Sequence, residues 1–183
     1  KQRLGLPVFV KPARGGSSIG VSKVNSWEEF PAAVDLALED DEKILVEPEI
    51  VGQEVEIGVL HYADGTLLAS VPALLAGIDD SDEGFYGFDT KYLDNVVTAE
   101  IPAPFTPELT EKLRDMAVRA FEALNCEGLS RVDFFVTEDS VYINEINTLP
   151  GFTPISMYPQ VLAASGVEYP ALLEALIEQA LAK

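Results

Sequence analysis

Residues 131–151, RVDFFVTEDSVYINEINTLPG, constrain the fold of this chain more than any other stretch. Residues 131–136 and 141–147 alternate as strands do, and each strand has one polar and one apolar face. The polar residues 138–140 between them suit a short hairpin loop, and a Pro-Gly pair follows the second strand. The stretch therefore predicts an antiparallel hairpin.

The register of this hairpin decides which side chains meet. A three-residue loop would place Thr137 opposite Val141. It then pairs three further positions: Phe135 with Ile143, Asp133 with Glu145, and Arg131 with Asn147. Because alternate side chains of a strand share a face, the four polar residues of these pairs form one cluster. A slip of one residue would scatter this cluster onto both faces.

The predicted cluster has the chemistry of a metal site. Asp133 and Glu145 would repel one another across the strands, and a cation would relieve that repulsion. The available ligands are carboxylate and amide oxygens, which suit magnesium completed by substrate phosphates. Two plainer interpretations stay open: the carboxylates form a solvated hairpin face, and Arg131 is a salt-bridge partner of Asp133.

Composition narrows the class of protein. The chain has 183 residues, of which 48% are hydrophobic, so we expect one domain, or a domain with a smaller lobe, and no global disorder. Its formal net charge of -19 argues against nucleic acid and anionic membranes as partners. No apolar run approaches the length of a membrane span, and the single cysteine excludes an intrachain disulfide. We expect a soluble cytoplasmic protein, and the start at Lys1 suggests a fragment.

Two other stretches carry candidate anion-binding groups. Residues 7–11 predict a strand that ends in Lys11, and the loop 12–20 that follows is rich in glycine and serine. Such a loop can direct backbone N–H groups at a phosphate, although an ordinary flexible hairpin remains the alternative. Residues 77–94 are long, aperiodic and aromatic, which is typical of a functional or disordered loop, and Lys91 is their one basic residue.

Together these groups suit a polyphosphate. Lysines, an arginine, a magnesium site and backbone amides are the parts with which proteins bind and transfer phosphoryl groups. No nucleophile with an adjacent base is evident, and the one histidine, His61, lies elsewhere. The chemistry is therefore expected to depend on positioning and charge neutralisation.

Five motifs resemble D-alanine:D-alanine ligases of the ATP-grasp superfamily: VKPARGGSSIGVSKV, ILVEPEIVGQEVEIGVL, FDTKYLD, GLSRVDFF and NEINTLPGFTPISMYP. The resemblance runs from about Pro7 to the C-terminus. It implies an α+β fold, with an incomplete small strand-and-helix lid lobe in residues 1–52 and a larger, mostly antiparallel sheet flanked by helices in residues 53–183. It also implies that the N-terminal domain of the same protein and the first part of its central domain are missing here.

The resemblance assigns the predicted cluster. Asp133, Glu145 and Asn147 would bind two Mg²⁺ ions, with Glu145 bridging and Mn²⁺ as a possible substitute. Arg131 and the backbone N–H of Gly151 would stabilise an oxyanion. The carboxylate of the second D-alanine would be held by two further residues, Ser156 and Met157.

The resemblance also implies ATP contacts along the chain. They are Lys11, Ser17 and Ser18 with the phosphates, Glu47 and Ile50 with adenine, Glu54 with the ribose, and Lys91 with the terminal phosphates. Tyr92 would link its loop to Ser17 when the site closes, and it is typical of enzymes that form a dipeptide.

The implied activity joins two D-alanines through an acyl phosphate, for peptidoglycan precursor synthesis. Two alternatives remain: another ATP-grasp carboxylate–amine ligase, or, for this truncated chain, an ATP- and magnesium-binding module without turnover. D-alanine and the missing N-terminal domain are the expected partners, and a homodimer is possible.

Overall fold

The computed structural model describes residues 4–76, 98–153 and 155–182. Contacts between Cα atoms divide the described chain into two compact units. The first contains residues 4–51 together with Thr98, and the second contains residues 52–76 and 99–182. Whether these units are the two lobes expected from the sequence stays a prediction. Lys91 and Tyr92, with the rest of their loop, lie outside the described residues.

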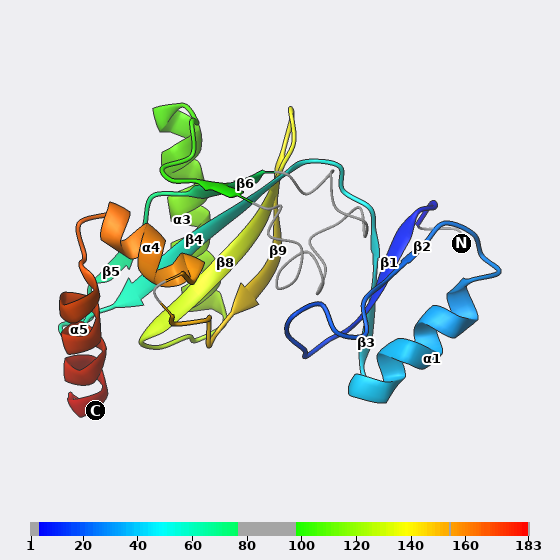
Figure 1. Cartoon of the computed structure of the whole chain (residues 1–183), viewed down its shortest axis with the longest axis horizontal. Coiled ribbons are helices and arrows are strands. Elements are labelled where there is room, and N and C mark those ends of the chain that lie inside the picture. Colours follow the sequence, from blue (N-terminus) through cyan, green and yellow to red (C-terminus); the bar gives the residue numbers. More distant parts are fainter. Residues whose placement is uncertain (1–3, 77–97, 154, 183) are drawn as a thin grey trace. The chain divides into compact units, whose positions relative to one another are not determined.

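The first unit is a three-stranded antiparallel sheet with one helix (Figure 1). Its elements are β1 (Val8–Pro12), β2 (Ser22–Val24), α1 (Phe30–Asp40) and β3 (Ile44–Pro48), and the strand order is β2-β1-β3. Val8 and Val10 are fully buried with Ala33 and Ala37 of α1. Because strand side chains alternate, Lys11 of β1 lies on the face opposite this core.

The second unit contains the larger sheet. Its strands are β4 (Gln53–His61), β5 (Leu67–Ala69), β6 (Ala73–Ala76), β7 (Thr98–Glu100), β8 (Leu129–Val136) and β9 (Val141–Asn147). The order is β7-β6-β4-β8-β9, with β5 also paired to β4. β4 runs antiparallel to β5, β6 and β8, and β8 runs antiparallel to β9. A mostly antiparallel sheet flanked by helices is therefore confirmed for this unit.

Helices pack on both faces of the larger sheet (Figure 1). They are α3 (Pro107–Ala123), α4 (Met157–Ala164) and α5 (Tyr169–Leu181). On one face, Val55, Ile57 and Val59 of β4 are buried with Leu113 and Phe121 of α3. The other face packs Leu60 against a second cluster formed with α4 and α5. The strand alternation of β4 thus sends its odd positions to α3 and its even positions to the α4 side.

The hairpin β8–β9 differs from its predicted register near the turn. Val136, not Thr137, lies opposite Val141, and Phe135 lies opposite Tyr142 and not Ile143, so the three-residue loop is wrong. The register shifts between Asp133 and Phe134, where Asn144 is the extra residue of a β-bulge.

The bulge restores the expected pairs farther along the strands. Asp133 lies opposite Glu145, and Arg131 lies opposite Asn147, as the sequence predicted. The prediction made the loop one residue too short and did not include the bulge. These two errors cancel, because the extra residue Asn144 in the bulge shifts the register back by one position.

Among the described residues, none of the helices has both the length and the apolar character needed to cross a membrane.

Candidate active site

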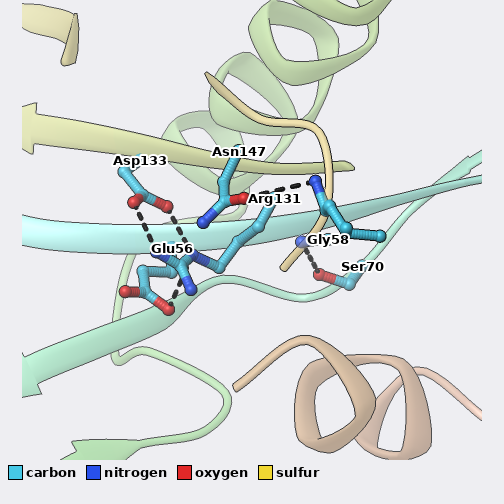
Figure 2. A network of polar contacts seen from close by, with 7 residues as sticks. Glu56, Gly58, Ser70, Arg131, Asp133 and Asn147 are labelled. Atoms are coloured by element: carbon cyan, nitrogen blue, oxygen red, sulfur yellow. Dashed lines mark hydrogen bonds and ion pairs between the residues drawn. The ribbon is translucent and has the colours of Figure 1, made fainter. Parts of the chain in front are cut away.

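Five polar side chains gather on the α4 side of the larger sheet. They are Glu56 of β4, Arg131 and Asp133 of β8, and Glu145 and Asn147 of β9, and we call them the polar face. In the register, Glu56 lies opposite Asp133 on one side of β8, and Glu145 lies opposite it on the other. Figure 2 shows the Glu56, Asp133 and Asn147 side chains around the guanidinium of Arg131.

The Arg131 guanidinium is the centre of this face. Its Nε donates to Oδ1 of Asp133 and its Nη2 donates to Oδ2, both at 2.7 Å. The same Nε lies 3.2 Å from Oε2 of Glu56 (Figure 2). Only 14% of the Arg131 side chain and 5% of the Glu56 side chain are exposed, so these charges meet largely out of water. A two-point guanidinium–carboxylate pair of this kind fixes orientation as well as charge.

The surrounding carboxylates stabilise the protonated form of the Arg131 guanidinium. Burial alone would lower the pKa of its guanidinium, but the hydrogen bonds and charge of Asp133, with the charges of Glu56 and Glu145, outweigh burial and raise that pKa. Arg131 is therefore a permanent cation, held in a fixed place and able to stabilise an oxyanion.

The predicted metal ligands come together in the register, but as two carboxylates and one amide. Within the described ranges no group of three or more His, Cys, Asp or Glu side chains could hold a metal ion. Both oxygens of Asp133 already accept from Arg131, and Oδ1 of Asn147 accepts from the Leu149 N–H at 3.3 Å. Oxygen ligands on neighbouring strands fit a hard cation such as Mg²⁺, which would share Asp133 with the guanidinium.

Gly151 and Ser156 lie side by side at the start of α4. A Cβ atom on Gly151 would come within 2.9 Å of the Ser156 Oγ, so a larger residue at position 151 would push this hydroxyl from its place. The Ser156 hydroxyl accepts from the Thr153 N–H at 3.0 Å and shares a hydrogen bond of 2.8 Å with the Thr153 hydroxyl. Ser156 precedes the first helical residue, Met157, but its side chain makes no capping bond to the helix. This leaves the hydroxyl in an exposed turn, where a ligand carboxylate can reach it.

Gly58 of strand β4 packs against α4, the helix that follows this turn. A Cβ atom at Gly58 would lie 2.5 Å from Leu162 and 3.1 Å from Tyr158, so α4 rests directly on the strand. The Gly58 N–H donates to the Ser70 hydroxyl at 2.9 Å (Figure 2). Close packing at Gly58 therefore sets the position of α4 and of the turn before it.

In the first unit, two predicted ATP contacts bind each other. The Lys11 ammonium lies 2.8 Å from Oε2 of Glu47. Ser17 and Ser18 both have positive φ values, 56° and 58°, in the loop between β1 and β2. Backbone in this conformation can direct N–H groups toward an anion. Ile50 is half-buried at the end of this unit, and Glu54 is half-buried on β4 of the second unit.

The glycine-serine loop has an anchor that the sequence did not suggest. The Asp41 carboxylate accepts from the backbone N–H of Arg14 at 2.9 Å and from its guanidinium at 3.0 and 2.8 Å. It also accepts from the Lys43 N–H at 3.0 Å. These bonds, led by the one from the Arg14 side chain, hold the pKa of Asp41 well below its usual range. A charged Asp41 thus ties the start of the loop to the end of α1.

Sequence reasoning missed Glu56 on the polar face. The signal was present, because Glu54 and Glu56 alternate on one strand and must share a face. The pairing of β4 with β8, which brings Glu56 to Arg131, is a long-range contact that no local pattern reveals.

Comparisons with known proteins identify the relatives of this chain. The family described as "D-ala D-ala ligase C-terminus" matches residues 1–178. The D-alanine–D-alanine ligase of Corynebacterium efficiens is 67% identical over 181 residues, which cover 99% of this chain and 50% of that protein. The chain thus spans about half the length of such relatives.

Solved structures share the fold. The D-alanine-D-alanine ligase from Coxiella burnetii has a TM-score of 0.80 at 36% identity, over 95% of this chain and 44% of that one. VanG D-Ala:D-Ser ligase from Enterococcus faecalis has a TM-score of 0.81 at 34% identity, over 97% of this chain and 50% of that one. The α+β fold is that of ATP-grasp ligases, and the chain belongs to the D-alanine–D-alanine ligase family, whose C-terminal part it matches.

Proposed function

We propose that the protein containing this chain is an ATP-dependent ligase that joins two D-alanines into D-alanyl-D-alanine, a precursor of peptidoglycan. The observation that carries the proposal is the polar face: a largely buried, permanently charged arginine beside the side-chain oxygens of Asp133, Glu145 and Asn147, in a chain of this family. A reaction that uses ATP for cell-wall precursors belongs in the cytoplasm, and a homodimer is compatible with the proposal.

The proposed reaction has two steps. A carboxylate oxygen of the first D-alanine takes the terminal phosphoryl group of ATP, and ADP leaves. The amine of the second D-alanine then attacks the acyl phosphate carbon, phosphate leaves, and the amine loses its proton. Negative charge develops on the carbonyl oxygen during the attack, and the guanidinium of Arg131 and the N–H of Gly151 stabilise it. Neither group needs to change protonation state, which suits catalysis by positioning.

Asp133, Glu145 and Asn147 would hold the magnesium ions, whose charge offsets that of the phosphates. Within this chain, Ser156 at the exposed turn binds the carboxylate of the second D-alanine, with Met157 beside it. Lys11, Ser17 and Ser18 bind ATP phosphates, Glu47 and Ile50 bind adenine, and Glu54 binds the ribose. Lys91 and Tyr92, outside the described residues, are assigned to the terminal phosphates and to closure.

A second candidate is a ligase of the same fold with a different acceptor. VanG, which this chain resembles at 34% identity, is a D-Ala:D-Ser ligase. The 67% identity to a D-alanine–D-alanine ligase favours the dipeptide of two D-alanines.

The test is to incubate the full-length protein with ATP, Mg²⁺ and D-alanine and to measure ADP and D-alanyl-D-alanine together. We expect one dipeptide for each ADP. D-serine and D-lactate, each added with D-alanine, serve as competing acceptors. ADP release that depends on one of these and not on D-alanine alone would replace the proposal with the second candidate. The 183-residue chain, assayed in parallel, is expected to give no dipeptide.

A further inference from the structure

Glu56 is a buried charge on the polar face without an assigned role. Its side chain is 5% exposed, and its Oε2 lies 3.2 Å from Nε of Arg131 (Figure 2). A carboxylate this deeply buried is unfavourable unless a charged partner compensates it. Glu56 belongs to β4, whereas the ligands proposed for the metal ions belong to β8 and β9.

The proposed function makes two demands on Asp133. Both of its oxygens accept hydrogen bonds from Arg131 at 2.7 Å, and the same oxygens are the proposed ligands of a divalent cation. A cation bound there draws on the carboxylate and repels the guanidinium, so the hold of Asp133 on Arg131 weakens when the site is loaded. Arg131 must nevertheless stay in place to stabilise the oxyanion.

Glu56 can meet this need because it reaches Arg131 from a different strand. It lies opposite Asp133 in the β4–β8 register and approaches the Nε atom. Its backbone is fixed on both sides, since β4 also pairs Glu56 with Ala73 of β6. A carboxylate on a central strand keeps its position whether or not Asp133 turns toward a cation.

We propose that Glu56 is the positioning residue for Arg131: it keeps the guanidinium in place while a divalent cation engages Asp133. The proposal rests on the proposed function for the role of Arg131 and of the cation. A purely structural ion pair between Glu56 and Arg131 would affect stability and leave the loaded site unchanged.

The first test observes Arg131 directly in the full-length wild-type protein labelled with ¹⁵N-arginine. The Nε–H signal of Arg131 is assigned by its disappearance in Arg131→Lys. On addition of Mg²⁺ with ADP, the signal is expected to shift but to remain sharp and slow to exchange with water. Broadening or loss of the signal on loading would overturn the proposal, because Glu56 would then not hold the guanidinium. Because the Nε–H also donates to Asp133, the same spectrum of Glu56→Gln is the matched comparison, and its signal is expected to broaden on loading. Neither measurement needs turnover.

The second test compares Glu56→Gln and Glu56→Asp with Glu138→Gln, which removes an exposed charge from the turn of the same hairpin. Glu56→Gln is expected to lower kcat about 10- to 100-fold and to change the KM for ATP by less than about twofold. Glu56→Asp should restore part of the loss. In an Arg131→Lys background, Glu56→Gln should cost less than about twofold, since Glu56 acts through Arg131.

The outcomes separate the two proposals. If the wild type makes no dipeptide, but its Nε–H signal stays sharp on loading and broadens in Glu56→Gln, the proposed function fails and the pairing of Glu56 with Arg131 stands. If the wild type makes dipeptide and Glu56→Gln loses thermal stability without losing kcat, the positioning role is wrong and the proposed function stands.

Discussion

At the scale of single residues, the polar face contains buried side chains, which affect stability, and an exposed one, whose expected effect is on turnover. Arg131 and Glu56 are largely buried and bind each other, whereas Glu145 is exposed on β9. Replacing a surface residue usually changes the free energy of unfolding by less than about 0.5 kcal/mol. The proposed function makes Glu145 one of the residues that would hold the magnesium ions, so loss of its charge should matter for turnover alone.

Glu145→Gln in the full-length protein is therefore expected to abolish dipeptide formation, lowering kcat by at least about 10²-fold, with the melting temperature nearly unchanged. The measurement is ADP and dipeptide release together with a thermal melt. Glu138→Gln, in the exposed turn, is the control and should keep full activity. Full activity of Glu145→Gln would rule out its assignment as a metal ligand.

Asp41 gives a prediction about acid stability. Its pKa in the folded chain lies below its ordinary value of 3.8, chiefly because Arg14 donates hydrogen bonds to it. A lowered pKa means that its contribution to stability is complete above about pH 4 and is lost as the pH falls further. Asp41→Asn should destabilise the chain at pH 7 and flatten the fall in melting temperature below pH 4. Melts between pH 2 and pH 7 check this, with the exposed Asp139→Asn as control.

Residue identities on the polar face could be predicted to a large extent, because strand alternation groups side chains of one face. This alternation grouped four of the five residues, and their pairing in the structure is as expected: Arg131 with Asn147, and Asp133 with Glu145. Glu56 and Asp41 were not found, since each depends on a contact between segments far apart in the sequence.

At the scale of elements, the bulge in β9 shows what local patterns leave out. Val141 and Ile146 both pack against the core on the α3 side, although they are five residues apart. An unbroken strand sends positions an odd number apart to opposite faces, so one extra residue must lie between them. The spacing of these two apolar residues could have indicated the bulge from the sequence alone. The assumed three-residue loop gave the expected polar pairs without a bulge, so the bulge was not predicted.

The contact between α4 and β4 also belongs to this scale. Gly58→Ala would place a Cβ atom 2.5 Å from the side chain of Leu162 and 3.1 Å from that of Tyr158, both fully buried, so these side chains or the helix that carries them must shift. Overpacking of this kind costs about 1–3 kcal/mol. Chemical denaturation of the full-length protein measures the loss. Gly5→Ala, where no atom lies within 4 Å of the new Cβ, is the matched control and should be close to neutral.

The same substitution should weaken binding of the second D-alanine, because α4 carries the turn that contains Ser156. The KM for D-alanine, measured at saturating ATP, is expected to rise while the KM for ATP stays nearly constant. Equal increases in both would show that the helix does not act on the acceptor site alone.

At the scale of the whole molecule, the proposed ATP contacts are divided between two units of the chain. Lys11 and Glu47 belong to the first, and Glu54 belongs to the second with the proposed metal ligands. Each unit has its own buried core, so each can keep its part of the proposed site in shape. ATP binding therefore tests whether the 183 residues together form a nucleotide site, even without the N-terminal half of the relatives.

Calorimetric titration of the 183-residue chain with ATP is expected to show binding that strengthens when Mg²⁺ is present. Asp133→Asn should remove this strengthening, because the variant loses one carboxylate of the proposed cation site while the neutral side chain keeps its size. Weak binding without Mg²⁺ should survive in the variant, since Lys11 and the glycine-serine loop are unchanged. Binding by the wild-type chain that ignores Mg²⁺ would contradict the cation site, and no binding at all would mean that residues outside the chain complete the nucleotide site.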